Sequence, residues 1–414
     1  MTGQDAPGRP GPLIEVRGLR VDYGLGPDAV HAVIDADLTL LSGTVLGLAG
    51  ESGSGKSTLA YAMTRLLRAP GIITGGQVLL HGGTGSPAEA GTINLLAADE
   101  GQLRELRWSH IAVVMQSAMH ALNPVVTIGA QLTDVLQAHE LKMDRTDRRE
   151  RAAFLLEMVG ISADNLRRYP HQLSGGMRQR VMIAMALALE PAVVIMDEPT
   201  TALDVVTQRE ILTELAALQR ELSFAVLFIT HDLSLLVELA DSIAVMYAGR
   251  LLEQATAIDL YRAPRHPYTL GLLRSFPPLH GARAPLTGIP GSPPDLRTPP
   301  TGCPFHPRCG YAMDICRTEM PAAFRLGPGG RRSAACWLHD GAHDVPAELA
   351  TAGPGSEPGA GPGPGGTRPA PAPLMGAVRP AGATTVPDPA AVPPTGGASL
   401  PDAAGTTSAT GPMP

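Results

Sequence analysis

The sequence predicts an α/β fold whose central sheet is largely parallel. Three short apolar runs, at residues 44–50, 192–199 and 224–230, have the unbroken hydrophobicity of strands that are buried on both faces. Residues 56–68 and 207–222 lie between these runs and read as helices, the second with its large apolar side chains on one face. Because strands and helices alternate along the chain, we expect helices to cover a parallel sheet.

The remaining segments add strands, a helical region and a tail of different composition. Residues 13–23 partly alternate apolar and polar side chains, as a half-buried strand does, and residues 31–41 are a second candidate strand. Residues 92–168 read as mostly helical, and residues 241–254 read as two strands around a turn. Residues 346–414 are rich in Pro, Ala, Gly and Thr and carry almost no charge, so we expect this tail to be disordered.

The composition argues against several classes of protein. The 414 residues carry a formal net charge of −7, which does not favour a broad basic face for nucleic acid. No apolar run reaches the roughly 18 residues that a membrane span requires, and the first residues lack the apolar core of a secretory signal. We therefore expect a soluble, cytoplasmic chain that binds no nucleic acid.

Residues 50–58, "GESGSGKST", have the pattern of a phosphate loop: Gly, four residues, Gly, Lys, then Ser or Thr. They follow a buried strand and open a helix, which is the context that such a loop requires. Its backbone amides cradle phosphates, the lysine brings a positive charge to the outer phosphates, and the next hydroxyl ligates magnesium. The residues expected to contact a nucleotide are Ser52, Gly53, Ser54, Gly55, Lys56, Ser57 and Thr58.

Polar side chains follow three other apolar strands. Asp197 and Glu198 close "VVIMDE", where the first carboxylate would reach magnesium and the second would orient or deprotonate a water. His231 follows the next strand along the chain, so it would lie beside them, and Gln116 closes the strand "VVMQ". Each residue alone is also consistent with an ordinary strand end. Together with the phosphate loop, they favour catalysis on a bound nucleotide.

A second candidate anion-binding site lies in "QLSGGMRQR", residues 172–180. Ser174, Gly175 and Gly176 precede a long helical run, and a helix N-terminus offers free N–H groups to an anion. The alternative is a helix cap without a ligand. Tyr23, ahead of the phosphate loop, would stack on a purine base or lie at the edge of the core.

In this order and spacing, the motifs resemble those of the ATP-binding-cassette (ABC) ATPases over roughly residues 13–255. The phosphate loop matches the Walker A motif, "VVIMDE" matches the Walker B strand, and "LSGGM" matches the signature, which other phosphate-loop enzymes lack. Gln116 falls at the Q-loop position, Asp204 in the D-loop, His231 at the switch histidine and Tyr23 at the aromatic residue that stacks on adenine. The resemblance therefore implies an ATPase that binds ATP and Mg²⁺.

The resemblance also implies an architecture. A P-loop NTPase core of the RecA type carries an antiparallel β subdomain and an inserted helical subdomain. We therefore expect core residues 1–90, helical residues 91–185 with the signature, core residues 186–260 and a cysteine-containing extension at residues 261–345. The tail at residues 346–414 follows from composition alone and has no counterpart in the family.

In this family two cassettes pair head to tail, and each ATP lies between the phosphate loop of one and the signature of the other. Ser174, Gly175 and Gly176 would therefore hold the terminal phosphate of a nucleotide that is bound to a partner. Asp204 would also contact the nucleotide site. The implied magnesium ligands are Ser57, Gln116 and Asp197.

The segments "YPHQLSGGMRQR" and "QSAMHALNP" resemble the ATPases of oligopeptide and dipeptide importers, a group that also includes nickel importers. Residues 262–275 and 302–316 resemble the extension that those ATPases carry. This implies a peripheral subunit on the cytoplasmic face of the inner membrane, with a second and different cassette chain, two transmembrane permease subunits and an external substrate-binding protein. The alternatives are a nickel or other small-solute importer, an exporter, a non-transport cassette ATPase, and a regulatory nucleotide-binding subunit.

The four cysteines of the chain crowd into one segment. Cys303, Cys309, Cys316 and Cys336 have five, six and nineteen residues between them, none of them the tight C-x₂-C spacing of common zinc sites. In a cytosolic protein, where disulfides are disfavoured, four thiols with none left over suit a metal centre. We expect a [4Fe–4S] cluster, with tetrahedral zinc or unligated thiols as alternatives.

Overall fold

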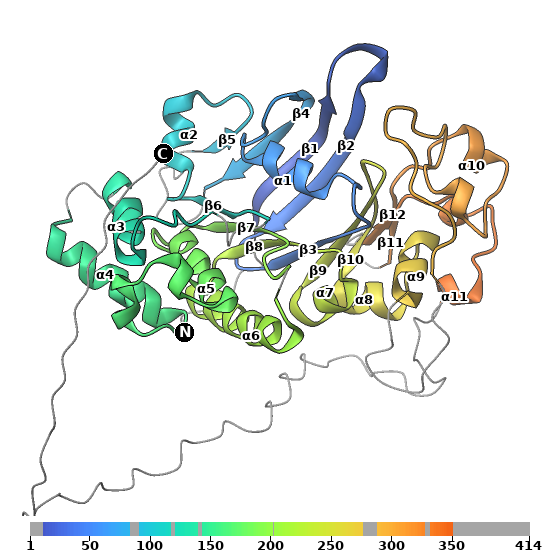
Figure 1. Ribbon diagram of the computed structural model, residues 1–414. Coiled ribbons are helices and arrows are strands. Elements are labelled where there is room, and N and C mark those ends of the chain that lie inside the picture. The colour runs from blue at the N-terminus through green and yellow to red at the C-terminus, as the bar shows by residue number, and fades with distance from the viewer. Residues whose placement is uncertain are drawn as a thin grey trace, which may run out of the picture. The chain divides into compact units, whose positions relative to one another are not determined.

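Two sheets form the centre of the computed structural model, which describes residues 11–82, 91–116, 121–139, 143–201, 203–275, 288–327 and 332–350 (Figure 1). The smaller sheet is antiparallel and has the strand order β2-β1-β4-β5. Its strands are β1 (Pro12–Tyr23), β2 (Val30–Leu41), β4 (Gly71–His81) and β5 (Thr92–Asn94). The expected antiparallel β subdomain is therefore present.

The larger sheet has the strand order β11-β12-β10-β9-β3-β8-β7-β6. Its central strands pair in parallel, β3 with β8 and β9, and β7 with β6 and β8, whereas β10, β11 and β12 extend one edge with antiparallel pairing. The parallel strands are β3 (Val45–Ala49), β6 (Ile111–Val114), β7 (Val193–Asp197), β8 (Ala225–Ile229) and β9 (Ser242–Tyr247). The antiparallel edge consists of β10 (Arg250–Thr256), β11 (Phe324–Leu326) and β12 (Arg332–Ala334).

Both faces of the large sheet are buried because they face two different cores. In β8, Leu227 belongs to the cluster shared with β1, β2 and helix α1 (Lys56–Met63), whereas Phe228 belongs to the cluster shared with the helices on the other face. Helix α1 packs against β1, β2 and β7, so it lies between the two sheets. The unbroken apolar runs of the sequence follow from this double burial.

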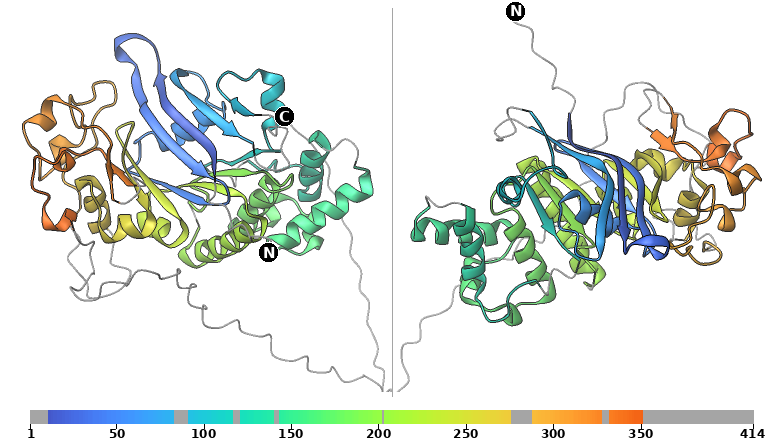
Figure 2. Two further views of the ribbon diagram at one scale, coloured as in Figure 1. Left: turned by 180° about the vertical axis from the view of Figure 1, so that it is seen from behind. Right: turned by 90° about the horizontal axis from the view of Figure 1, so that it is seen from above.

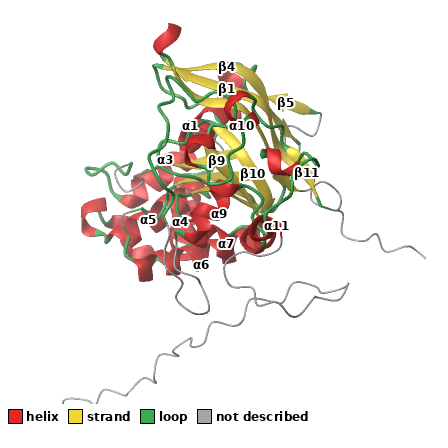
Figure 3. Cartoon of the chain, turned by 90° about the vertical axis from the view of Figure 1, so that its right-hand side faces the viewer, coloured by secondary structure: helices red, strands yellow, loops and turns green. Residues whose placement is uncertain are grey.

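The helices of the other face lie beneath the large sheet, opposite β1 and β4 (Figures 1 and 3). Figure 2 shows that α3 and α4 project beyond the sheet as a lobe of their own. The helices between β5 and β9 are α2 (Glu100–Leu106), α3 (Ile128–His139), α4 (Arg145–Met158), α5 (Gly175–Ala186), α6 (Val205–Leu222) and α7 (Leu233–Leu239).

The C-terminal extension continues the edge of the large sheet. Strand β12 pairs with β10, and a buried Glu253 on β10 accepts hydrogen bonds from Arg332 and from the backbone N–H groups of Arg265 and His266. This carboxylate therefore fastens two parts of the extension to the sheet. The helices here are α8 (Ala257–Arg262), α9 (Pro267–Arg274), α10 (Ile315–Thr318) and α11 (Ala347–Ala350).

Three features differ from the sequence-based expectation. In the region 92–168, which was expected to be mostly helical, β6 is the strand expected before Gln116, but β5 was not expected. Strand β4 was not expected at all. Helix α11 lies within the segment that was expected to be disordered. Its Leu349 is fully buried, and Glu348 contacts Arg274 and Tyr311, so the low-complexity tail begins after this helix. The rest of the expected tail, residues 351–414, lies outside the described residues.

Candidate nucleotide site

The phosphate loop joins β3 to α1, and its backbone requires glycine at two points. Gly55, which caps the helix, has φ +102°, and a Cβ there would lie 2.1 Å from the carbonyl oxygen of Ala32. Gly50 has φ +152°, and a Cβ there would lie 2.1 Å from the carbonyl oxygen of Met246. Any side chain at either position would push the loop away from β2 or β9, so these glycines fix the loop against the core.

Lys56 is buried at the first position of α1 and turns back over the loop. Its Nζ donates hydrogen bonds to the carbonyl oxygens of Gly50 (2.9 Å) and Glu51 (2.8 Å). Burial lowers the pKa of Lys56, and the negative charges of Glu198, Asp197 and Glu51 act in the opposite direction. The ammonium group is thus held at the phosphate loop by acceptors that a bound phosphate can replace.

Ser57 and Asp197 lie together, as the motif predicts for two magnesium ligands. The Ser57 Oγ donates to Asp197 Oδ1 at 3.0 Å, and Tyr61 Oη donates to the other carboxylate oxygen at 3.0 Å. Asp197 ends β7 and is fully buried, which raises its pKa. A hydroxyl and a carboxylate at this spacing are hard oxygen donors of the kind that Mg²⁺ takes, so the residues present fit the ion.

Glu198 lies at the centre of the other polar side chains that the sequence analysis identified as candidates, Gln116 and His231. Its carboxylate accepts from Gln116 Nε2 at 3.2 Å, and His231 Nδ1 lies 3.3 Å from its other oxygen. Thr201 Oγ1 also donates to it, at 3.2 Å. Glu198 has φ +45°, a left-handed backbone that is costly for a residue with a side chain and typical of functional sites. Three segments thus converge on one carboxylate, which is placed to take a proton.

Sequence reasoning missed Tyr61 and Thr201. Tyr61 lies four residues after Ser57 on α1 and therefore faces the same side of the helix. Thr201 lies three residues after Glu198 and donates to both its backbone carbonyl and its side chain. Both spacings could have been read from the sequence, since each residue is one turn away from a motif residue.

Tyr23 lies beside the start of α1. It ends β1, and its hydroxyl is 3.2 Å from Thr58 Oγ1. The half-buried ring therefore borders the phosphate loop, where the sequence placed it as a candidate for stacking on a base.

The second candidate anion-binding site lies on different elements from the phosphate loop. Ser174 caps α5, and its Oγ accepts from the backbone N–H of Met177 at 3.2 Å. Gly176 packs against α6, where a Cβ would lie 2.6 Å from the Thr207 side chain. Helix α5 packs against α3, α4, α6 and β6, whereas α1 packs against β1, β2 and β7.

Asp204 is the N-terminal cap of α6. Its carboxylate accepts from the backbone N–H groups of Val206 (3.1 Å) and Thr207 (3.0 Å) and from the Thr207 hydroxyl (2.7 Å). Hydrogen bonds from Thr207 lower the pKa of this exposed carboxylate. The contacts give Asp204 a structural role in the start of the helix.

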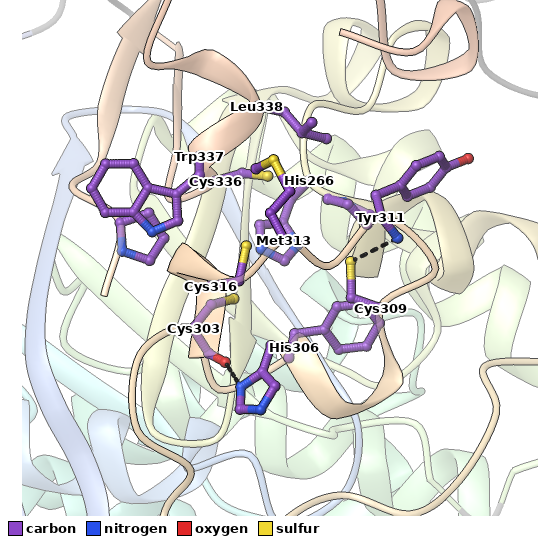
Figure 4. Close-up of a pocket in the computed structure, with 13 residues that line it drawn as sticks. His266, Cys303, His306, Cys309, Tyr311, Met313, Cys316, Cys336, Trp337 and Leu338 are labelled. Atoms are coloured by element: carbon purple, nitrogen blue, oxygen red, sulfur yellow. Dashed lines mark hydrogen bonds between the residues drawn. The ribbon is translucent and has the colours of Figure 1, made fainter. Parts of the chain in front are cut away.

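The four cysteines line one pocket of the extension, together with His266, Phe305 and Trp337 (Figure 4). All four are free thiols, and only Cys309 is not fully buried. Burial, with a smaller contribution from the neighbouring thiols, raises the pKa of Cys303 to about 11 and that of Cys336 to about 12. Among the described residues, no group of three or more His, Cys, Asp or Glu side chains is arranged so that it could hold a metal ion.

Comparison with known proteins decides the family. Residues 33–201 match the ABC transporter family, and residues 252–316 match the family "Oligopeptide/dipeptide transporter, C-terminal region". The dipeptide transport ATP-binding protein DppD of Caldanaerobacter subterraneus subsp. tengcongensis is 41% identical over 329 residues, which cover 79% of this chain and 97% of that protein. The chain belongs to the ABC transporter ATPases.

Two further relatives of this ABC ATPase support the assignment. The oligopeptide transport ATP-binding protein OppD of Salmonella typhimurium is 42% identical over 334 residues, which cover 80% of this chain and 96% of that protein. The structure of the ATP-binding cassette MJ0796, a dimer in a post-hydrolysis state with ADP and Pi, matches with a TM-score of 0.51 at 27% identity. That match covers 59% of this chain and 98% of the other.

The ABC ATPase thus carries the expected P-loop NTPase core and its family's extension. Nothing among its described helices has the length and apolar character needed to cross a bilayer.

Proposed function

We propose that this ABC ATPase hydrolyses ATP to power the uptake of dipeptides or oligopeptides. The observation that supports this best is the match of residues 252–316 to the oligopeptide/dipeptide transporter C-terminal region, beside a complete set of cassette motifs. The named relatives DppD and OppD, which the chain covers almost completely, are dipeptide and oligopeptide transport ATP-binding proteins. Nickel or another small solute is the alternative cargo.

In this proposal the side chains around Glu198 carry out the hydrolysis. Glu198 takes a proton from the attacking water, Gln116 and His231 hold that water and the terminal phosphate, and Lys56 pairs with the phosphates. Ser57 and Asp197, with Gln116, hold Mg²⁺, which supplies charge neutralisation to the leaving phosphate. Tyr23 stacks on the adenine.

In this proposal the second anion-binding site completes the nucleotide site of a partner cassette. At the start of α5, Ser174 is exposed, Gly175 is half-exposed and Gly176 is buried against α6. All three lie away from the elements that pack around the chain's own phosphate loop. We therefore assign them, with Asp204, to a nucleotide held by a second cassette, and expect that cassette to be a different chain.

The match to the oligopeptide/dipeptide transporter C-terminal region and the transport relatives DppD and OppD support the remaining partners. The subunit would sit peripherally on the cytoplasmic face of the inner membrane, bound to two permease subunits that receive cargo from an external binding protein.

Reconstitution of the purified complex in proteoliposomes tests this function. With the binding protein outside and ATP inside, labelled di- and oligopeptides should accumulate in the vesicles, and Glu198→Gln should stop the accumulation. ATP-dependent accumulation of Ni²⁺ without peptide would contradict the peptide assignment. ATP hydrolysis that no solute or binding protein stimulates would contradict a transport role.

We also propose that the four cysteines hold a [4Fe–4S] cluster. The four thiols line one pocket, and burial raises the pKa of Cys303, Cys309 and Cys336. These thiols would therefore lose protons readily only against a positive centre. The wide spacing of the cysteines along the sequence, none of it C-x₂-C, favours a larger cluster over tetrahedral zinc. Such a cluster would supply cationic charge to pair with the thiolates and would cross-link a segment with few core residues.

Anaerobic purification followed by iron, sulfide and zinc analysis, with the visible absorption spectrum, tests the centre. About four iron and four sulfide per chain would support the cluster. One zinc per chain, or a colourless metal-free protein whose extension is folded, would contradict it.

A further inference from the structure

Glu51, the second residue of the phosphate loop, is held by the C-terminal extension at both its backbone and its side chain. Its N–H donates to Tyr268 Oη on α9 at 2.8 Å, across 217 positions of sequence. Its carboxylate receives both arms of the Arg308 guanidinium, Nη1 at 2.7 Å and Nη2 at 3.1 Å, across 257 positions. The extension therefore reaches the loop that is built to hold phosphate.

Arg308 is itself fixed in place, unlike a mobile surface cation. Its side chain is only 7% exposed. Its Nε donates to the carbonyl oxygen of Pro290 at 2.7 Å, and its Nη1 also lies 3.3 Å from Tyr247 Oη. The guanidinium lies over the Tyr247 ring, 5.8 Å from the centroid. A planar fork with this many fixed partners presents a preorganised bidentate contact to a carboxylate.

The charge of Glu51 matters because of where the residue lies. The Lys56 ammonium group donates to the Glu51 carbonyl oxygen at 2.8 Å, so this residue borders the group that meets the phosphates. A free carboxylate here would repel a polyphosphate across a partly desolvated loop. The Arg308 fork neutralises that carboxylate and holds the loop against the extension.

The same short segment carries the contact and part of the cysteine pocket. Arg308 directly precedes Cys309, and Phe305 lines the cysteine pocket while packing edge-on against Tyr247 and at a tilt against Tyr268. The residue that contacts the phosphate loop and residues that line the thiol pocket thus belong to one short segment.

We propose that Arg308 is a positioning residue for ATP binding: through Glu51 it sets the conformation and charge of the phosphate loop. The extension is then a working part of the nucleotide site. This inference uses the ATP site described above, and it holds whatever the cysteines bind.

Variants of the full chain in its complex test the proposal through ATP affinity and steady-state kinetics. Arg308→Gln should raise the Kd for a fluorescent ATP analogue and the KM for ATP about tenfold, with kcat changed much less, because an unpaired carboxylate is left beside the loop. Arg308→Gln combined with Glu51→Gln should regain most of the lost affinity, since no charge then remains unpaired.

A second variant approaches the same contact from the loop, in case Arg308→Gln fails to fold. Glu51→Asp keeps the charge but shortens the side chain, so it should also raise the KM while leaving the extension unaltered. The matched control is Arg317→Gln, which removes a charge beside Cys316 from an exposed position and should leave the KM unchanged.

Unchanged ATP affinity in Arg308→Gln or in Glu51→Asp would overturn the proposal. So would a double variant that binds ATP as weakly as Arg308→Gln alone, because the effect would then come from general loss of structure. A wild-type complex that binds no ATP would instead contradict the assignment of the nucleotide site itself.

Discussion

The nucleotide site and the cysteine pocket both bring together side chains from distant parts of the chain, but the polar groups in the two regions have different surroundings. In the nucleotide site the buried charges already have protein partners: Asp197 accepts from Ser57 and Tyr61, and Lys56 donates to loop carbonyls. In the pocket the four thiols line one cavity, where burial, and to a smaller extent the neighbouring thiols, raises the pKa of Cys303, Cys309 and Cys336.

The difference shows how each region becomes ordered. The nucleotide site is preorganised by backbone, since strand ends and a glycine loop fix every polar group before a ligand arrives. The pocket is lined by apolar and thiol side chains, and its segments are held to the core through Glu253 on β10 and through Phe305, which packs against Tyr247 and Tyr268. We therefore expect substitutions in the first region to change chemistry and substitutions in the second to change stability.

The largest effect is expected from Glu198→Gln. The amide cannot take a proton, so kcat should fall about 10³-fold while ATP still binds, because Lys56 and the loop amides remain. Steady-state ATPase rates and nucleotide binding on the purified complex measure both. The control is Glu190→Gln, which changes another carboxylate with a left-handed backbone, paired with Arg151 and not with the site residues. Near-normal turnover in Glu198→Gln would remove this residue from catalysis.

The next effect concerns the partner's site. Ser174→Arg places a bulky cation at the start of α5 and should lower turnover about 100-fold at the site whose phosphate loop belongs to the other cassette. Photo-labelling of each phosphate loop with an ATP analogue separates the two sites. The matched control, Ser162→Arg, alters another serine that caps a helical turn of the same lobe and should leave both sites labelled. Loss confined to this chain's own phosphate loop would contradict the head-to-tail arrangement.

The sequence predicted which polar side chains lie together around Glu198 and Asp197, because their placement is encoded locally. Each polar residue follows an apolar strand, and parallel strands end at one edge, so His231 and Glu198 had to meet once β7 and β8 were neighbours. Strand β4 was not predicted because Gly75 and Gly76 interrupt the alternation of apolar and polar residues. Gly76 is required by close packing, since a Cβ at this position would lie 2.5 Å from Leu19 Cα.

The contacts of the extension could not be predicted in this way. Nothing in the residues around Arg308 or Tyr268 indicates a partner more than 200 positions earlier. Leu349 likewise lies at the edge of a segment of low complexity, and its burial depends on a pocket built by other parts of the extension. Long-range packing decides these contacts, and a single sequence does not record it.

A smaller effect, mainly on stability, is expected from Cys336→Ser. The thiol is buried in the pocket, and a hydroxyl there is poorly matched to its apolar and sulfur neighbours, so the free energy of unfolding should fall by about 2 kcal/mol. Thermal unfolding of the complex and its metal content measure the change. Ser333→Ala, on adjoining β12 and outside the pocket, is the control. If Cys336→Ser abolished hydrolysis while unfolding and metal content stayed normal, the assignment of this region to stability would be wrong.

The smallest effect, from Tyr268→Phe, tests where the two regions meet. The substitution keeps the ring that packs on Tyr247 and Phe305 but removes the oxygen that accepts the Glu51 N–H. Leaving this donor without its partner should cost about 1 kcal/mol, and since the loop must then be ordered by the nucleotide, the KM for ATP should rise about fivefold. Tyr261→Phe, on neighbouring α8, removes a hydroxyl from a half-exposed ring and should leave the KM unchanged.

A KM equal to that of the wild type in Tyr268→Phe, together with a lowered unfolding temperature, would mean that the extension supports the core without shaping the phosphate loop. A raised KM with an unchanged unfolding temperature would mean that a contact made from outside the cassette motifs sets how well the loop binds ATP.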